Sequence, residues 1–172
     1  MKKSARITPI IIALLLCFTG IKAQSFDQIF DKYSEKEGVS SVYISKHMFE
    51  LMSKMEQEDQ EMKDIMYNLD NIRILAFEGS SFTAIDFEKE VIPMIPLDEY
   101  KELMVVREQN EKSAFYILEQ AGRIKELLMI ATSNGESILL SITGNIKLSQ
   151  IARLSESMDI HGLDKLEEAE TN

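Results

Sequence analysis

The sequence predicts an α+β domain, in which a mainly antiparallel sheet of about six strands is packed with helices. Residues 101–143 contain four apolar or alternating segments separated by short polar turns, which is typical of a four-strand meander. The last of these turns contains Asn134-Gly135, a pair that tolerates the positive φ of a tight hairpin. Ahead of the meander, two strand segments flank a helical one, in the order of an N-terminal β-α-β unit.

The first 23 residues have the pattern of a secretory signal peptide. Three basic residues precede an unbroken apolar run over residues 10–18, and a polar boundary follows at Ala23. The run is shorter than the roughly 20 apolar residues that a membrane-spanning helix needs. We therefore expect export to the periplasm or cell envelope, cleavage after Ala23, one domain over residues 24–158 and a flexible acidic tail over residues 159–172.

Cys17 is the single cysteine and lies inside the apolar run. Cleavage after Ala23 would leave no thiol, no disulfide and no cysteine metal ligand. The alternative is a lipoprotein modified at Cys17, but the preceding Leu16 is larger than the small residue that usually stands there.

The predicted mature chain is strongly acidic. Removing 23 of the 172 residues leaves 149, enough for one domain without a disulfide. The formal charge moves from −10 to −14, because the removed segment holds four basic residues and no acidic ones. Phosphate backbones repel such a chain, so we expect no nucleic-acid partner and membrane contact only through the signal segment or a lipid.

The N-terminal half of the mature chain begins with two amphipathic patterns. Ser25 and Gln28 form a capping-box pattern that starts a helix, and Gly38 is expected to end it. A strand at residues 39–44 leads to a second helical segment with two apolar stripes, which predicts one bent helix or two helices joined near Asp59. The stripes contain Met48, Leu51, Met52 and Met55, and then Met62, Ile65, Met66 and Leu69.

A second strand at residues 71–77 would run parallel to the first if both lie in one sheet. A helix over residues 84–91 is expected to stop at Pro93 and Pro96, because proline cannot donate a backbone hydrogen bond.

The meander has an internal order of its own. Its two middle strands are apolar on both faces and are expected to be central, whereas residues 103–108 are typical of an edge strand. Gly144-Asn145 is expected to break the last strand, after which Leu148, Ile151, Leu154 and Met158 predict a closing amphipathic helix that can dock on the sheet.

These segments resemble a family of exported bacterial proteins catalogued as domain of unknown function 4252. The resemblance implies a small envelope protein, covers nearly all of the mature chain and brings no catalytic motif. The residues that carry it are Lys22-Ala23-Gln24, Gly38 to Met48, Ile72 to Leu75, Tyr100 to Met104 and Ile142 to Ile146.

Metal chemistry has little support in the sequence. His47 and His161 are far apart and have no ligands at zinc spacing. Met48, Met52 and Met55 could bind Cu(I), but their positions coincide with an apolar stripe, so we favour core packing. The acidic run over residues 56–64 lacks the spacing of a calcium loop and is predicted to be a solvated helix face.

Motifs for catalysis and phosphate binding are also missing. The segment Gly79 to Thr83 lacks the second glycine of a nucleophile elbow, and no glycine-rich phosphate loop occurs. Gly144-Asn145 could present helix amides to an anion, but we favour a simple turn.

No catalytic, cofactor-binding or metal residue is therefore predicted. We expect a non-catalytic binding or interaction module, with an unknown envelope protein or small ligand as partner. The alternatives are a carboxylate-based hydrolase and a self-associating structural protein.

Overall fold

The computed structural model describes residues 25–55, 59–78, 82–147 and 149–150. The predicted signal segment, most of the predicted closing helix and the acidic tail lie outside these residues. None of the helices in the described part of the chain is long and apolar enough to cross a membrane.

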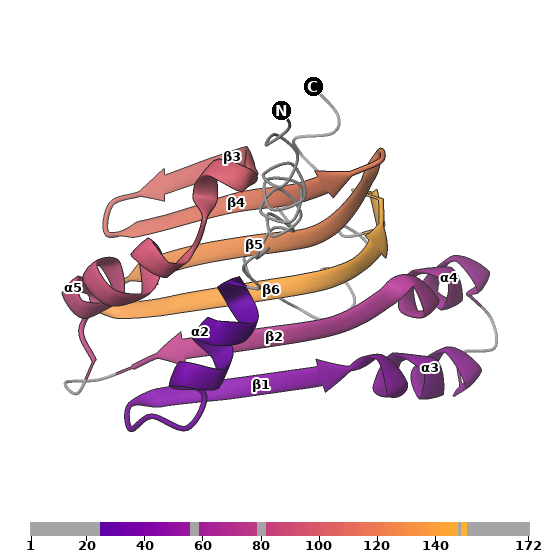
Figure 1. The fold of residues 1–172 in the computed structure, drawn as a ribbon, viewed down its shortest axis with the longest axis horizontal. Coiled ribbons are helices and arrows are strands. Elements are labelled where there is room, and N and C mark those ends of the chain that lie inside the picture. The colour runs from indigo at the N-terminus through magenta and orange to yellow at the C-terminus, as the bar shows by residue number, and fades with distance from the viewer. Residues whose placement is uncertain (1–24, 56–58, 79–81, 148, 151–172) are drawn as a thin grey trace, which may run out of the picture.

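Six antiparallel strands form one sheet in the order β1-β2-β6-β5-β4-β3 (Figure 1). The predicted α+β class and the six-strand sheet are thus confirmed. The strands are β1 (Val39–Ser45), β2 (Leu69–Phe77), β3 (Lys101–Glu108), β4 (Glu111–Gln120), β5 (Arg123–Ser133) and β6 (Glu136–Ile146). The α-helices are α2 (Ser25–Tyr33), α3 (Lys46–Met55), α4 (Gln60–Asn68) and α5 (Ala84–Asp86).

The expected parallel pairing of the first two strands is wrong. β1 and β2 are antiparallel neighbours, with Val39 opposite Phe77 and Ser45 opposite Asn71. The reason is the pair of helices between them, because α3 leads the chain away from the sheet and α4 brings it back to the same end. Of the two predicted alternatives, one bent helix or two helices joined near Asp59, the structure has the second. Asp59 is the N-cap of α4, and its carboxylate accepts a hydrogen bond from the Met62 amide at 3.0 Å.

The meander has the predicted form. β3 is an edge strand and β4 and β5 are interior strands, and Asn134 and Gly135 both have positive φ in the β5–β6 turn. β6 does not break at Gly144-Asn145 as expected but continues through Ile146. The C-terminal end of β6 therefore extends two residues beyond Gly144, where the sequence predicted that the strand would end.

Helical backbone after β2 also differs from the prediction. Only Ala84–Asp86 is α-helical, and a π-helical segment (Phe87–Val91) and a 3-10 turn (Ile92–Met94) follow. Pro93 lies at the start of the 3-10 turn, where its missing amide proton is not needed. A second 3-10 turn at Leu97–Glu99 leads into β3.

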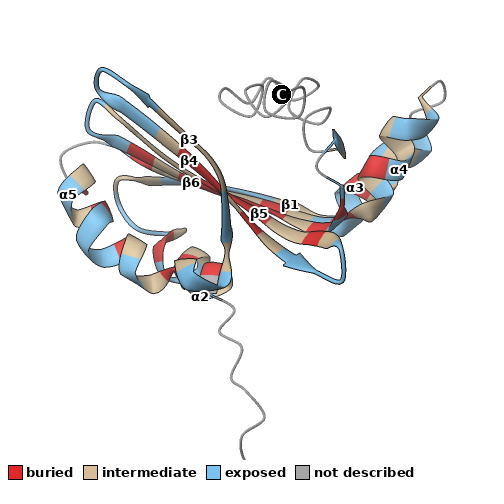
Figure 2. Cartoon of the chain, turned by 90° about the horizontal axis from the view of Figure 1, so that it is seen from above, coloured by how far each residue is buried: buried red, intermediate tan, exposed pale blue. Residues whose placement is uncertain are grey.

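Both faces of the sheet carry an apolar core, and alternate residues of one strand belong to different cores. Leu127 belongs to the core that includes Phe49 of α3 and Ile65 of α4. Leu128 belongs to the core that includes Ile29 of α2 and Phe87. Figure 2 shows the same arrangement, with α2 and α5 against one face and α3 and α4 at the other end of the twisted sheet. The two faces are called here the α2 face and the α3 face.

Gly144 allows the start of β2 to pass close to β6. A Cβ at this position would overlap the backbone oxygen of Asn68 and lie 3.1 Å from the Cα of Leu69. Backbone atoms cannot move aside as a flexible side chain can. We expect Gly144→Ala to lower the free energy of unfolding by about 1–3 kcal/mol, measured by urea denaturation.

Gly122→Asn is the matched control, because Gly122 lies in open space and asparagine tolerates its positive φ of 73°. A loss for Gly144→Ala no larger than that for Gly122→Asn would contradict the close approach.

Candidate functional site

In the part of the chain that the structure describes, His47 and the acidic run do not come together as a metal site. His47 is exposed on α3, and its Nδ1 lies 3.6 Å from Oε2 of Glu50. Glu61 and Asp64 are exposed on α4, in agreement with a solvated helix face. Among the described residues, no group of three or more His, Cys, Asp or Glu side chains could hold a metal ion. His161 and Gly79 to Ser81 lie outside the described residues.

The prediction that Met48, Met52 and Met55 pack into the core is wrong. Their exposed fractions are 50, 41 and 79%, and the buried residue of α3 is Phe49. α3 lies at the edge of the molecule beside α4, so only a narrow side of the helix contacts the core (Figure 1). Phe49 occupies that side, and the residues of the apolar stripe remain exposed.

A pocket of about 320 Å³ opens on the α2 face of the sheet. It lies among α2, the segment before β3 and strands β2, β4, β5 and β6. Its lining is polar in places where the rest of this face is apolar. The lining residues are Phe26, Asp27, Arg73, Pro96, Glu99, Tyr100, Leu118, Glu119, Gln120, Lys125, Glu126, Ser141 and Thr143.

Arg73 projects from β2 on one side of the pocket and forms an ion pair with Asp27 of α2. The side chain of Arg73 is 19% exposed and that of Asp27 is 35% exposed, so the cation is mostly withdrawn from water and the carboxylate only partly. The guanidinium carbon lies 5.7 Å from the ring centre of Phe30 and 5.3 Å from that of Tyr43, within cation–π range. Burial lowers the pKa of Arg73, and the negative charge of Glu126 opposes that shift.

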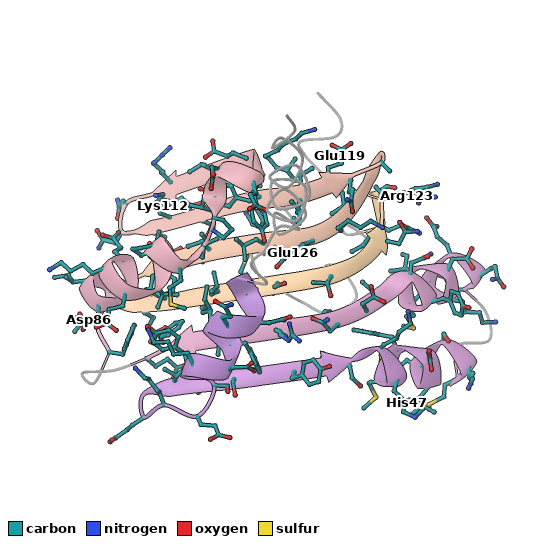
Figure 3. All side chains as sticks on the ribbon, in the orientation of Figure 1. His47, Asp86, Lys112, Glu119, Arg123 and Glu126 are labelled. Carbon is teal, nitrogen blue, oxygen red and sulfur yellow. The ribbon has the colours of Figure 1, made fainter. Side chains whose placement is uncertain are left out.

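Glu126 projects from β5 near the middle of the sheet, on the face that carries α2 (Figure 3). Its Oε2 accepts a hydrogen bond from the Tyr100 hydroxyl at 2.8 Å, and its Oε1 accepts one from the Ser141 hydroxyl at 2.6 Å. Ser141 is fully buried on β6. Because both oxygens are bonded to side chains of other strands or segments, the carboxylate is fixed in position.

Two irregularities in strand pairing adjoin the pocket. The register shifts between Ile124 and Glu126 in the β5–β6 pair, and between Leu118 and Glu119 in the β4–β5 pair. Such bulges bend strands and redirect side chains. They therefore account for the polar side chains that collect at this point of the sheet.

The pocket has a negative balance of charge. Its lining holds four carboxylates, of Asp27, Glu99, Glu119 and Glu126, against the two cations Arg73 and Lys125. Lys101 binds Glu119 from outside the lining, with a distance of 2.8 Å between Nζ and Oε2. The arrangement can accept hydrogen bonds from a positively charged group more readily than it can hold an anion.

Sequence reasoning named none of these residues as a site. A signal was present, because Arg73 interrupts an apolar strand between Ile72 and Ile74, and Ser141 does the same between Leu140 and Ile142. Polar side chains at inward positions of a covered strand need partners. Which partners they have depends on the order of strands, which the sequence did not show.

The comparisons with known proteins leave the function of this site open. The model of a family described as a domain of unknown function, DUF4252, matches residues 33–154, which is more than half of the chain. The match includes Arg73, Tyr100, Glu126 and Ser141 but not Asp27. No curated protein and no solved structure matches the chain.

The hydrogen bond from Ser141 to Glu126 can be tested against a neighbour on the same strand. We expect Ser141→Ala to lower the free energy of unfolding by about 1–3 kcal/mol, because a hydrogen bond to a charged, partly buried group is lost. Ser137→Ala is the control, since the Ser137 hydroxyl is buried too but has no hydrogen-bond partner among the described residues. Equal losses in urea denaturation would show that the Ser141 hydroxyl contributes nothing to holding Glu126.

Proposed function

We propose that this chain, which belongs to the family of the domain of unknown function DUF4252, is a non-catalytic binding module for a small molecule that carries a positively charged nitrogen. The single observation that supports this is the Glu126 carboxylate, which two hydroxyl groups hold in place inside a pocket with an excess of carboxylates. Fixed acceptors of this kind favour a ligand that donates charge-assisted hydrogen bonds.

The size and walls of the pocket suit such a ligand. Its volume lies at the lower end of the roughly 300–1,000 Å³ that small-molecule sites occupy. Phe26 and Tyr100 line it beside the acidic groups and offer aromatic surface to the apolar part of a ligand or to its cation. Asp27 pairs with Arg73 and Glu119 pairs with Lys101, so the other two carboxylates of the lining, those of Glu99 and Glu126, stand against the single cation Lys125.

We also propose that the protein works outside the cytoplasm, in the periplasm or cell envelope. Support comes from the basic residues, the short apolar run and the boundary at Ala23 in the first 23 residues. A chain without a cysteine after that boundary suits an oxidising compartment. Mass spectrometry of the protein purified from its native cells tests this, because cleavage predicts a new N-terminus at Gln24.

Isothermal titration calorimetry with small amines tests the binding role. We expect primary amines to bind more tightly than carboxylic acids of the same size, because a protonated amine can donate hydrogen bonds to the Glu126 carboxylate. Glu126→Gln should weaken the binding of the best amine by about tenfold or more, because an ionic hydrogen bond becomes a neutral one.

Glu136→Gln removes the same charge at the exposed start of β6, outside the pocket, and serves as the matched control. Preferential binding of the acids, or equal affinity in the Glu126→Gln variant and the Glu136→Gln control, would refute a cation site at Glu126.

A carboxylate-based hydrolase is the second candidate, because several acidic side chains meet in one pocket, as that chemistry requires. The hydrogen bonds that fix Glu126 and the ion pair that neutralises Asp27 favour binding over catalysis. Cleavage of chromogenic glycosides or esters that is lost in both Glu126→Gln and Asp27→Asn would establish the hydrolase in place of the binding module.

A further inference from the structure

A β-bulge brings two neighbouring residues of opposite charge into the pocket on the α2 face. In the β4–β5 pair, Glu126 is opposite Leu118. The next pair is Ile124 opposite Glu119, which leaves Lys125 without a partner on β4. Ile124 is buried in the core of the α3 face, so a regular strand would place Lys125 on the α2 face and Glu126 on the α3 face. Both residues instead line the pocket on the α2 face.

The charge of Lys125 is not compensated by a carboxylate in the described part of the chain. Its Nζ has one hydrogen-bond partner there, the neutral Oδ1 of Asn145 at 3.4 Å. A bond of this length is weak. Lys125 is therefore available to a carboxylate of a ligand, as the fixed Glu126 is to an ammonium group.

A second carboxylate, that of Glu99, lies at a distance from this pair. Glu99 directly precedes Tyr100, whose hydroxyl binds Glu126, so the length of the Tyr100 side chain separates the backbone of Glu99 from the Glu126 carboxylate. Glu99 is exposed, and its carboxylate has no hydrogen bond or ion pair to another described residue. The pocket thus has a pair of opposite charges at one point and a further negative charge beyond an aromatic ring.

We propose that the pocket binds a free α-amino acid with a basic side chain, such as lysine, an inference that rests on the proposed cation site at Glu126. The α-ammonium group binds Glu126, and the adjacent α-carboxylate binds Lys125. The aliphatic stem lies along the Tyr100 ring, and the side-chain ammonium group reaches Glu99. Two positive charges and one negative charge of the ligand then meet two negative charges and one positive charge of the pocket.

Isothermal titration calorimetry at neutral pH with four matched ligands tests this. Lysine carries all three charges, and each of the others lacks one of them: Nα-acetyllysine the α-ammonium group, lysine amide the carboxylate and norleucine the side-chain ammonium group. We expect lysine to bind about fivefold or more tightly than Nα-acetyllysine and lysine amide, because a charge-assisted hydrogen bond is lost in each. The advantage over norleucine should be smaller, about two- to fivefold, because Glu99 is exposed.

Lys125→Met tests the carboxylate contact. It should weaken lysine binding by about fivefold or more and should not weaken the binding of lysine amide, because only lysine has the charge that Lys125 recognises. Lys112→Met is the matched control, since Lys112 is exposed on β4 and lies outside this pocket (Figure 3).

Glu99→Gln tests the side-chain contact. It should weaken lysine binding by about two- to fivefold and leave norleucine binding unchanged. Asp98→Asn removes the same charge from the neighbouring residue of the same 3-10 turn, outside the lining, and is the control. Circular dichroism melting curves check that every variant is folded.

Equal affinity for lysine and lysine amide would overturn the free amino acid, because the N-terminal lysine of a peptide has the same charges as lysine amide. Norleucine that binds as tightly as lysine would overturn the basic side chain. Either result leaves the cation site at Glu126 in place, whereas failure of lysine, lysine amide and norleucine to bind at all would remove the proposed function as well.

Discussion

The pairing of β2 with β6 is the contact on which the rest of the structure depends. β6 ends the meander but is apolar on both faces, so without β2 it would be an exposed edge with unpaired backbone groups. β2 comes from the N-terminal half of the chain and brings α3 and α4 with it on one side and, through β1, α2 on the other. One ladder of hydrogen bonds thus joins both halves into a single sheet with two covered faces.

This constraint also determines where the pocket lies. Arg73 is on β2 and Ser141 is on β6, and the two residues are directly opposite each other in the ladder. β5 pairs with the other side of β6 and adds Glu126, while Asp27 approaches from α2. A fold that needed only apolar packing here would not place charged groups at the centre of a sheet, because their withdrawal from water is costly unless each is paired. Polar groups retained at such a place therefore suggest function more strongly than the many carboxylates at the surface.

Local features were predictable from the sequence, and features that depend on distant contacts were not. The Asn134-Gly135 turn and the apolar character of β4 and β5 are properties of neighbouring residues, and they located the meander correctly. The direction of β2 depends on whether the intervening chain crosses the sheet or turns back, and Asp59 indicated only that a break was possible. Gly144 suggested the end of a strand, but its real role is to let the backbone of Asn68 pass. The sequence assigned Met48, Met52 and Met55 to the core because they lie on an apolar stripe of the helix, whereas in the structure Phe49 is the residue of α3 that is buried.

The alternation of side chains along β2 ties the pocket to the core on the opposite face of the sheet. Arg73 points to the pocket on the α2 face, while the adjacent Ile72 is buried in the core of the α3 face together with Phe49 of α3 and Ile65 of α4. Close packing resists movement, so a strand that is packed on both faces holds its side chains in fixed positions. The apolar core of the α3 face therefore helps to keep Arg73, and with it the geometry of the pocket, in place.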